Sequence, residues 1–403
     1  MVTQTVLSQD SLVLTLLCTH LGSPRSSGLN PLTDGEWDAL AERIGRSALK
    51  TPSSLFGLPA RQISDALSLE PNLSERVARL LERSGPIAFE LERLSSMGIW
   101  ILTRADSQYP RLLRRRLRSR TPALFYGLGE RRSLSAGGVA VVGSRDLDDE
   151  SLLFASIVGR AAANANLTVF SGGSRGADLI AMRGALETGG GAVGVLVDGL
   201  EKSLRDSDTR EMLSTGALCL ISPFNPNAPF RAGNAMARNK VIYCLGALAV
   251  VVASNEGKGG TWAGATEALK NGWIPIFVRQ GHREMDGNRR LLELGASLVP
   301  PDRERDPQLL GQWLRLIYEM NPPSDAATQW QQDLFDVAWQ LISGFLTVPR
   351  TESEIGRRFG LVPEQVVNWL ETALVRGLAS RSTHGWVRGA ASDPAQQSLF
   401  DGL

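Results

Sequence analysis

Between residues 137 and 300 the chain alternates short apolar runs with longer stretches at helical spacing. Six runs rich in valine, isoleucine and leucine lie at 137–143, 167–173, 191–199, 217–223, 247–254 and 273–279. Continuous apolar runs of this length are typical of strands buried on both faces, and the helix-length intervals are typical of crossover connections. The pattern predicts an α/β fold built on a Rossmann-like, doubly wound, mostly parallel sheet.

The flanking regions follow different patterns. Within residues 10–95 the apolar positions repeat at helical spacing, and in one segment Leu73, Val77 and Leu80 share a face after a cap expected at Asn72 or Ser74. Two short apolar runs, 99–102 and 123–126, enclose an arginine-rich helical turn. Near the carboxyl end the order helix, turn, helix and two short strands favours a winged helix.

These patterns predict a domain organisation with four boundaries. We expect a helical domain at 1–95, a Rossmann-like domain at 96–320, a linker at 321–332, a winged-helix-like domain at 333–390 and a tail at 391–403. The linker contains adjacent prolines, which mark chain breaks.

Composition narrows the function without identifying it. Of 403 residues, 43 are Lys or Arg and 42 are Asp or Glu, so with a net charge of +1 any nucleic-acid binding depends on a local patch. The three cysteines lack metal or redox spacing, and neither a signal peptide nor an apolar span of membrane length is visible. We therefore predict a cytoplasmic protein without metal or cofactor, and no nucleophile elbow or paired-carboxylate pattern indicates an enzyme.

Two glycine-rich junctions between predicted strands and helices favour phosphate binding. The first places Ser144 and Arg145 after Gly143, and the second places Ser174 and Arg175 among several glycines. Backbone N–H groups in such loops, together with the helix dipole, form a site for anions. The spacing G-x-G-x-x-G is absent, which argues against a dinucleotide coenzyme.

Two later junctions combine cations with aromatic residues. Phe230 precedes Arg231 and Arg238 in one, and in the other Lys258 lies in a further glycine-rich loop beside Trp262, before a predicted helix. Aromatic rings that stack bases beside cations that hold the backbone are typical of a groove for single-stranded nucleic acid. A core position for Phe230 remains an equal alternative.

Several short motifs in a specific order resemble the DNA-processing protein A family (DprA, also called Smf) of bacteria. They cover residues 97–300 and include Tyr109-Pro110, the P-x-L-F-x-x-G at 122–128, G-S-R at 143–145, S-G-x-x-R-G-x-D at 171–178 and R-N-K at 238–240. Gly260-Thr261 lies in a loop similar to another family motif. The helical start, SAM- or HhH-like, and the winged-helix end also agree with the long architecture of that family.

The resemblance implies a protein that binds and protects single-stranded DNA and helps to load the RecA recombinase in transformation or recombination. The residues expected to bind DNA are Gly143, Ser144, Arg145, Ser171, Gly172, Gly173, Ser174, Arg175, Gly176, Phe230, Arg231, Arg238, Asn239, Lys240, Lys258, Gly260 and Thr261. The chain departs from the family pattern at Ala177, at Met182, around Leu204-Arg205 and at Lys240, where charge is kept without the forked geometry of arginine.

Alternatives and further partners remain open. A nucleotide-sensing or nucleotide-hydrolysing protein would use Glu267 and Arg175, and an adaptor in phage defence would use a winged helix whose charge is balanced. Six arginines at 111–120 favour a solvated helix face over a DNA track. Gln396, Leu399 and Phe400 resemble a peptide that binds the sliding clamp, and a second copy of the chain is another candidate partner.

Overall fold

The computed structural model describes residues 7–22, 28–280, 286–322, 335, 338–339, 341–375, 378–383 and 385–388. The chain divides into two compact units, Met1–Pro323 and Ser324–Leu403. The predicted boundary between residues 95 and 96 stays a prediction. No helix within these described residues is both long and apolar enough to cross a bilayer.

The first unit is built on a nine-stranded sheet in the order β1-β2-β6-β5-β4-β3-β7-β8-β9. The strands are β1 Trp100–Thr103, β2 Leu124–Gly129, β3 Gly138–Val142, β4 Thr168–Ser171, β5 Ala192–Val195, β6 Leu218–Ser222, β7 Leu248–Val251, β8 Ile276–Val278 and β9 Ser297–Leu298. All pairs from β6 to β9 are parallel, whereas β1 and β2 pair antiparallel at one edge. Each of the six predicted apolar runs forms a strand, and the mostly parallel α/β fold is confirmed.

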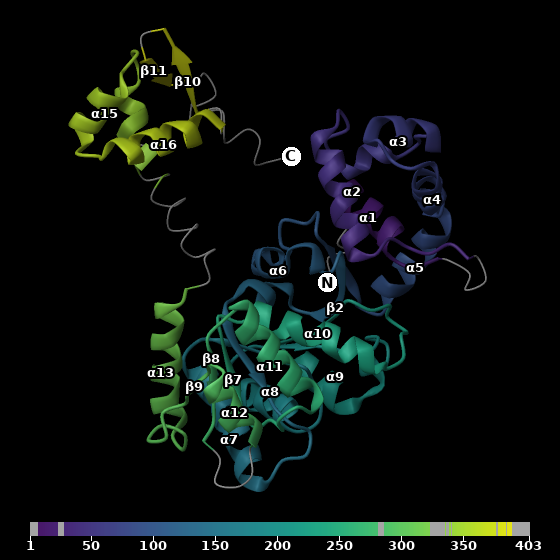
Figure 1. Ribbon diagram of the computed structural model, residues 1–403, viewed down its shortest axis with the longest axis vertical. Helices are drawn as coiled ribbons and strands as arrows, with labels where there is room; N and C mark the ends of the chain where they lie inside the picture. Colours follow the sequence, from purple (N-terminus) through teal and green to yellow (C-terminus); the bar gives the residue numbers. More distant parts are fainter. Residues whose placement is uncertain are drawn as a thin grey trace. The chain divides into compact units, whose positions relative to one another are not determined.

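Helices cover both faces of this sheet (Figure 1). One face carries α7 (Asp149–Asn164), α8 (Ala177–Glu187), α9 (Ser207–Ser214) and α13 (Pro307–Met320); the other carries α6 (Arg111–Leu117), α10 (Ala232–Leu245), α11 (Gly259–Asn271) and α12 (Asp286–Glu293). Alternate residues of β3 serve the two cores, Val139 and Val141 on one side and Ala140 and Val142 on the other. This two-sided burial explains why the strands are continuous apolar runs rather than alternating ones.

The chain changes direction across the sheet at β3. From β3 it proceeds through β4 and β5 to β6, and it then returns to the far side of β3 to form β7. In the register Val139 lies opposite Val169 of β4 and Leu248 of β7. The connections leave β3 and β7 in opposite directions, so their carboxyl ends border a crevice, the topological switch point where ligands bind in this class of fold.

Among the described residues, five helices precede the sheet: α1 (Gln9–Cys18), α2 (Asp34–Arg46), α3 (Ala60–Leu67), α4 (Pro71–Leu81) and α5 (Ser84–Ser96). Short 3-10 turns lie at Pro52–Leu55, Arg118–Arg120, Arg131–Ser135 and Ser203–Arg205. Helix α1 contacts β1 and β2. Val77 and Leu80 of α4 are fully buried as expected, but the predicted caps are wrong. The helix begins at Pro71 with Glu70 as N-cap, because proline is favoured at a first helical position.

The second unit contains α15 (Glu352–Phe359), α16 (Pro363–Val375), β10 (Ala379–Ser382) and β11 (Gly385–Arg388). Strands β10 and β11 form an antiparallel pair. Ile355, Leu370 and Trp386 belong to its own hydrophobic core. The order of helices and strands agrees with the predicted order, while its identity as a winged helix stays a prediction.

Candidate nucleic-acid interface

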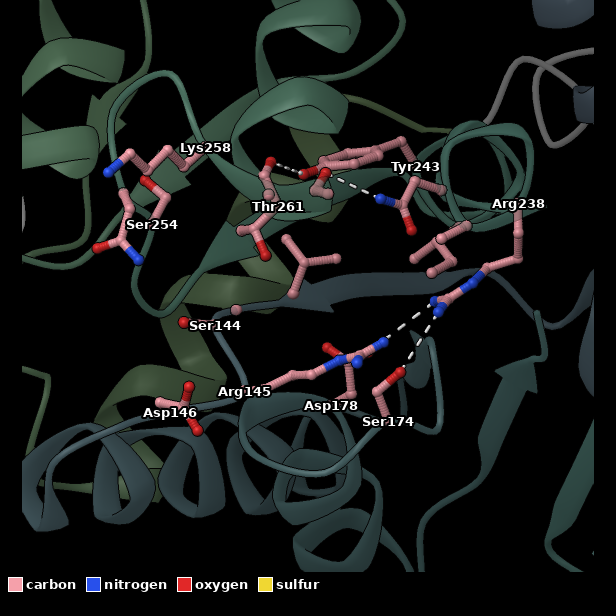
Figure 2. A pocket seen from close by; sticks show the side chains of 18 residues that line it. Ser144, Arg145, Asp146, Ser174, Asp178, Arg238, Tyr243, Ser254, Lys258 and Thr261 are labelled. Atoms are coloured by element: carbon pink, nitrogen blue, oxygen red, sulfur yellow. Dashed lines mark hydrogen bonds and ion pairs between the residues drawn. The ribbon is translucent and has the colours of Figure 1, made fainter. Parts of the chain in front are cut away.

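A pocket of about 370 Å³ lies at the switch point. Its walls are the loops that follow β3, β4 and β7, together with one face of α10 and the first turn of α11 (Figure 2). Three of the loops predicted to bind phosphate therefore come together in one place. We call this cavity the switch-point pocket.

Two glycines let the first two loops approach each other. A Cβ atom on Gly143 would lie 2.4 Å from the Ala177 Cβ, and one on Gly176 would lie 2.6 Å from the Ser144 carbonyl oxygen. Gly176 also has a φ of +89°, a conformation that side chains disfavour. These positions require glycine for packing, which explains the motif without assigning either residue a contact to a ligand.

A buried arginine lies in the pocket wall. Arg238 of α10 is 4% exposed; its Nη2 donates to the Ser174 Oγ at 3.4 Å and its Nη1 lies 3.9 Å from the Asp178 Oδ2 (Figure 2). Its Nε is buried and has no hydrogen-bond partner in the described part of the chain. A Cβ on Gly172 would overlap the Arg238 guanidinium, so this glycine makes room for the arginine.

Asp178 is the buried counter-charge of that arginine. Burial raises the pKa of Asp178 to about 6, while Arg238 and hydrogen bonds from the backbone N–H groups of Ser174 and Gly143 act in the opposite direction. Burial likewise lowers the pKa of Arg238. The pair is held at 3.9 Å, beyond hydrogen-bond distance, so the Arg238 Nη1 keeps its hydrogen-bonding capacity for an incoming anion.

Helix α11 presents an N-terminus without a side-chain cap to this pocket. Lys258 is the N-cap residue, the first turn is Gly259, Gly260 and Thr261, and it contains no acidic residue. The Asn239 Nδ2 donates to the Gly260 carbonyl at 2.8 Å, which ties α10 to the loop. Free backbone N–H groups, the helix dipole and the Lys258 ammonium therefore produce positive potential at one point.

Helix α7 does not offer the same site, and this corrects part of the prediction for Ser144 and Arg145. The Asp148 carboxylate accepts the Ser151 N–H at 2.7 Å, and Asp149 and Glu150 occupy the first turn. These carboxylates neutralise the positive end of the helix. Any contact of this loop with phosphate depends on Ser144 and Arg145 themselves, without support from the α7 dipole.

Phe230 lies at the surface, so the alternative of a core position is wrong. Its side chain is 49% exposed, and the Arg145 Cζ lies 5.8 Å from its ring centroid. Arg231 follows as the exposed N-cap residue of α10. A cation and an exposed ring from different loops thus lie side by side.

Other predicted residues do not line the switch-point pocket. Ser171 is fully buried and donates its hydroxyl to the Val141 carbonyl at 2.6 Å, so it joins β4 to β3. Arg175 is exposed but lies outside the pocket lining. Lys240 lines a different pocket, because successive helix residues are 100° apart and Lys240 is turned away from the face that carries Arg238 and Asn239.

The prediction missed nine of the residues that line this pocket, three of which are polar residues of the loops. Asp146, Ser254 and Asn255 face the pocket from the loops after β3 and β7. The sequence could have pointed to two of them, since Ser254 and Asn255 are the first polar residues after an apolar run that predicts a strand.

Residues named for the alternatives lie elsewhere. Glu267 forms an ion pair with Arg120 at 3.0 Å and does not line the switch-point pocket, so the carboxylate named for hydrolysis is not at this site. Met182 is 1% exposed in the core. In the arginine run, Arg116 donates to the carbonyls of Cys244 and Gly246 and so closes the end of α10. Gln396, Leu399 and Phe400 lie outside the described residues.

The chain matches one protein family in sequence and resembles a solved structure in fold. The family model for DNA recombination-mediator protein A matches residues 100–306, just over half of the chain. A structure of DNA processing protein A from Streptococcus pneumoniae is 22% identical, with a TM-score of 0.56 over 74% of this chain and 96% of that chain. A structure of DNA processing protein A from Helicobacter pylori, which describes that protein's single-stranded DNA binding mode, is 20% identical. Its TM-score is 0.44 over 55% of this chain and 97% of that chain. No curated protein matches the sequence.

Proposed function

Because the chain belongs to the DNA recombination-mediator protein A family, we propose that it binds single-stranded DNA at the switch-point pocket and delivers it to a RecA-type recombinase. In this proposal the protein acts by binding, without catalysis. The strand contacts Arg145, Phe230 and Arg238 together with the first turn of α11.

One observation carries the proposal: the free N-terminus of α11 opens into a pocket whose wall holds the buried Arg238. A phosphate there meets backbone N–H groups and the Lys258 ammonium, with the Arg238 guanidinium in the pocket wall. The site reads the backbone and no base, as expected for a protein that accepts any sequence.

Phe230 supports a preference for single strands. Its exposed ring offers a platform beside the Arg145 guanidinium, and stacking on such a ring requires an unpaired base. Duplex DNA keeps its bases stacked within the helix and offers only phosphates to the same residues. We therefore expect tighter binding to single strands than to duplexes of the same sequence.

The test is a fluorescence-anisotropy titration of labelled single-stranded and duplex oligonucleotides at several salt concentrations. We expect the single strand to bind tighter, and Lys258→Ala to reduce the salt slope by about 0.7 for one lost phosphate contact. Lys270→Ala is the matched control, because it removes the same charge from the far end of α11, where Lys270 is exposed.

Equal salt slopes for Lys258→Ala and Lys270→Ala would contradict the placement of the strand. Absence of any DNA binding at low salt would contradict the function itself and favour a nucleotide ligand for the pocket.

Delivery to the recombinase has its own test. Strands coated with single-strand-binding protein should acquire RecA filaments faster when this protein is present, and Lys258→Ala should slow that step in proportion to its lost DNA affinity. The second unit, proposed as a winged helix, would then dock protein rather than DNA. No acceleration by the unmodified protein would contradict the delivery step.

A further inference from the structure

A second pocket of about 270 Å³ lies on the other side of α10. It is enclosed by the end of α1, the start of α2, strand β2, the loop after β6 and α10 itself. Arg238 and Asn239 face the switch-point pocket, whereas Ala237 and Lys240 face this second pocket. The two cavities are therefore separated by the width of one helix, about 10 Å.

Aromatic side chains form part of the second pocket. Phe224 is half-buried, and Tyr126 is 2% exposed. Burial raises the pKa of Tyr126 and Thr19 offsets part of that rise, yet the phenol oxygen completes no hydrogen bond of normal geometry within the described residues. A lining of this kind suits a flat, partly polar ring.

Two opposite charges lie at the same cavity. One Asp34 carboxylate oxygen accepts the Ala123 N–H at 2.8 Å, which holds the side chain in place, and the other oxygen accepts no hydrogen bond from the residues that the structure describes. Lys240 has no carboxylate within ion-pair distance among the residues that the structure describes, but burial raises the pKa of Asp34 and the Lys240 ammonium opposes that rise from across the cavity. Arg120 also lines the pocket, but its guanidinium is already paired with Glu267. The cavity thus offers an acceptor for N–H groups and a cation for an anionic group.

We infer that the second pocket binds one nucleotide whose base carries an amino group, with the base against Phe224 and Asp34 and the phosphate toward Lys240. Carboxylates accept hydrogen bonds from the N4 amino group of cytosine, and adenine and guanine also carry exocyclic amines. Thymine has a carbonyl oxygen where cytosine has its amine, so it would place an acceptor against a carboxylate. The pocket therefore prefers cytosine to thymine.

The nucleotide can come from the bound strand or from solution. The strand source rests on the proposed function, since a strand held at the switch-point pocket needs only to cross α10 to reach Lys240. A free nucleotide would use the same contacts without any strand.

The experiment compares oligonucleotides of cytosine only and thymine only, of equal length and at neutral pH, by fluorescence anisotropy. We expect the cytosine strand to bind about fivefold to tenfold tighter to the full chain. Asp34→Asn should abolish this preference, because the amide keeps an acceptor for Ala123 but presents a donor to the base. Asp65→Asn is the control, since Asp65 is an exposed carboxylate on α3.

Calorimetric titration of deoxycytidine monophosphate separates the two sources. Binding that Asp34→Asn abolishes would identify the free nucleotide as a ligand, whereas a strand preference without such binding would identify the strand. A cytosine preference that survives in Asp34→Asn, or no preference together with no binding of the mononucleotide, would overturn the inference. Failure of the proposed function differs, because then neither strand binds.

Discussion

Helices α7 and α11 follow the adjacent parallel strands β3 and β7, and the loop before α7 and the first turn of α11 line the same pocket, yet the two helix N-termini differ in charge. Helix α7 is capped by Asp148 and has Asp149 and Glu150 in its first turn, whereas α11 has Lys258 at its N-cap and no acid. A glycine-rich loop before a helix is thus insufficient for an anion site. The residues of the first turn decide whether the helix dipole is available to a ligand.

The largest loss of DNA affinity is expected when the first turn of α11 is given an acidic residue, as in α7. Thr261→Asp places a carboxylate in the first turn of α11, a position where acids favour the helix. We expect single-strand affinity to fall by about tenfold or more, because the carboxylate repels phosphate at short range. Thr261→Asn is the control of equal size, and anisotropy titrations measure both; equal losses for both would show that the charge is not the cause.

Removing the exposed ring tests whether Arg145 of the β3–α7 loop acts beside Phe230 of the β6–α10 loop, without help from the α7 dipole. Phe230→Ala should weaken single-strand binding by about tenfold, since stacking of one base is worth about 1–3 kcal/mol. Duplex binding should change much less. Phe89→Ala, which removes another exposed ring from α5, is the control; an unchanged affinity for Phe230→Ala would remove the ring from the interface.

Acidification should raise the affinity for single-stranded DNA, by a smaller factor than the two substitutions above lower it. Asp178 has a pKa raised to about 6, so it is charged above this pH and becomes neutral below it. Loss of its charge frees Arg238 for phosphate, and affinity should rise a few-fold as pH falls through 6 and then level off. Asp178→Asn should show a flat profile over this range, and a pH dependence that persists in this variant would assign the effect to another group.

The smallest effect is expected at α7. Asp149→Asn combined with Glu150→Gln should change single-strand affinity by less than about twofold, because Asp148 still caps the helix. The free energy of unfolding should fall by about 0.5–1 kcal/mol, as measured by urea denaturation, since the helix dipole loses two favourable charges. A large gain in DNA affinity would instead place the strand at α7.

The strands and the chemistry of the loops were predictable because both are local properties. Valine-rich runs buried on two faces cannot be exposed at low cost, so 137–143 and 247–254 had to form internal strands. Arg238 and Lys258 could be named as cations near helix starts for the same reason. The acids at 148–150 were also visible, and weighing them as caps would have removed α7 from the predicted anion sites.

Other properties depend on contacts between distant residues. The antiparallel edge of β1 and β2, the order of strands around β3 and the meeting of three loops in one pocket follow from pairing across the chain. Ser171 belongs to a phosphate-like motif, but its hydroxyl joins two strands, and no local pattern distinguishes these roles.

Lys240 also shows which properties are local and which depend on tertiary contacts. The motif at 238–240 establishes three polar residues on one helix, and the chain itself determines that they are polar and helical. Which of them faces the switch-point pocket depends on how α10 is rotated against the sheet. That rotation is set by the burial of Val241, Ile242 and Cys244 in the core, an interaction that exists only after the sheet and helix have packed together.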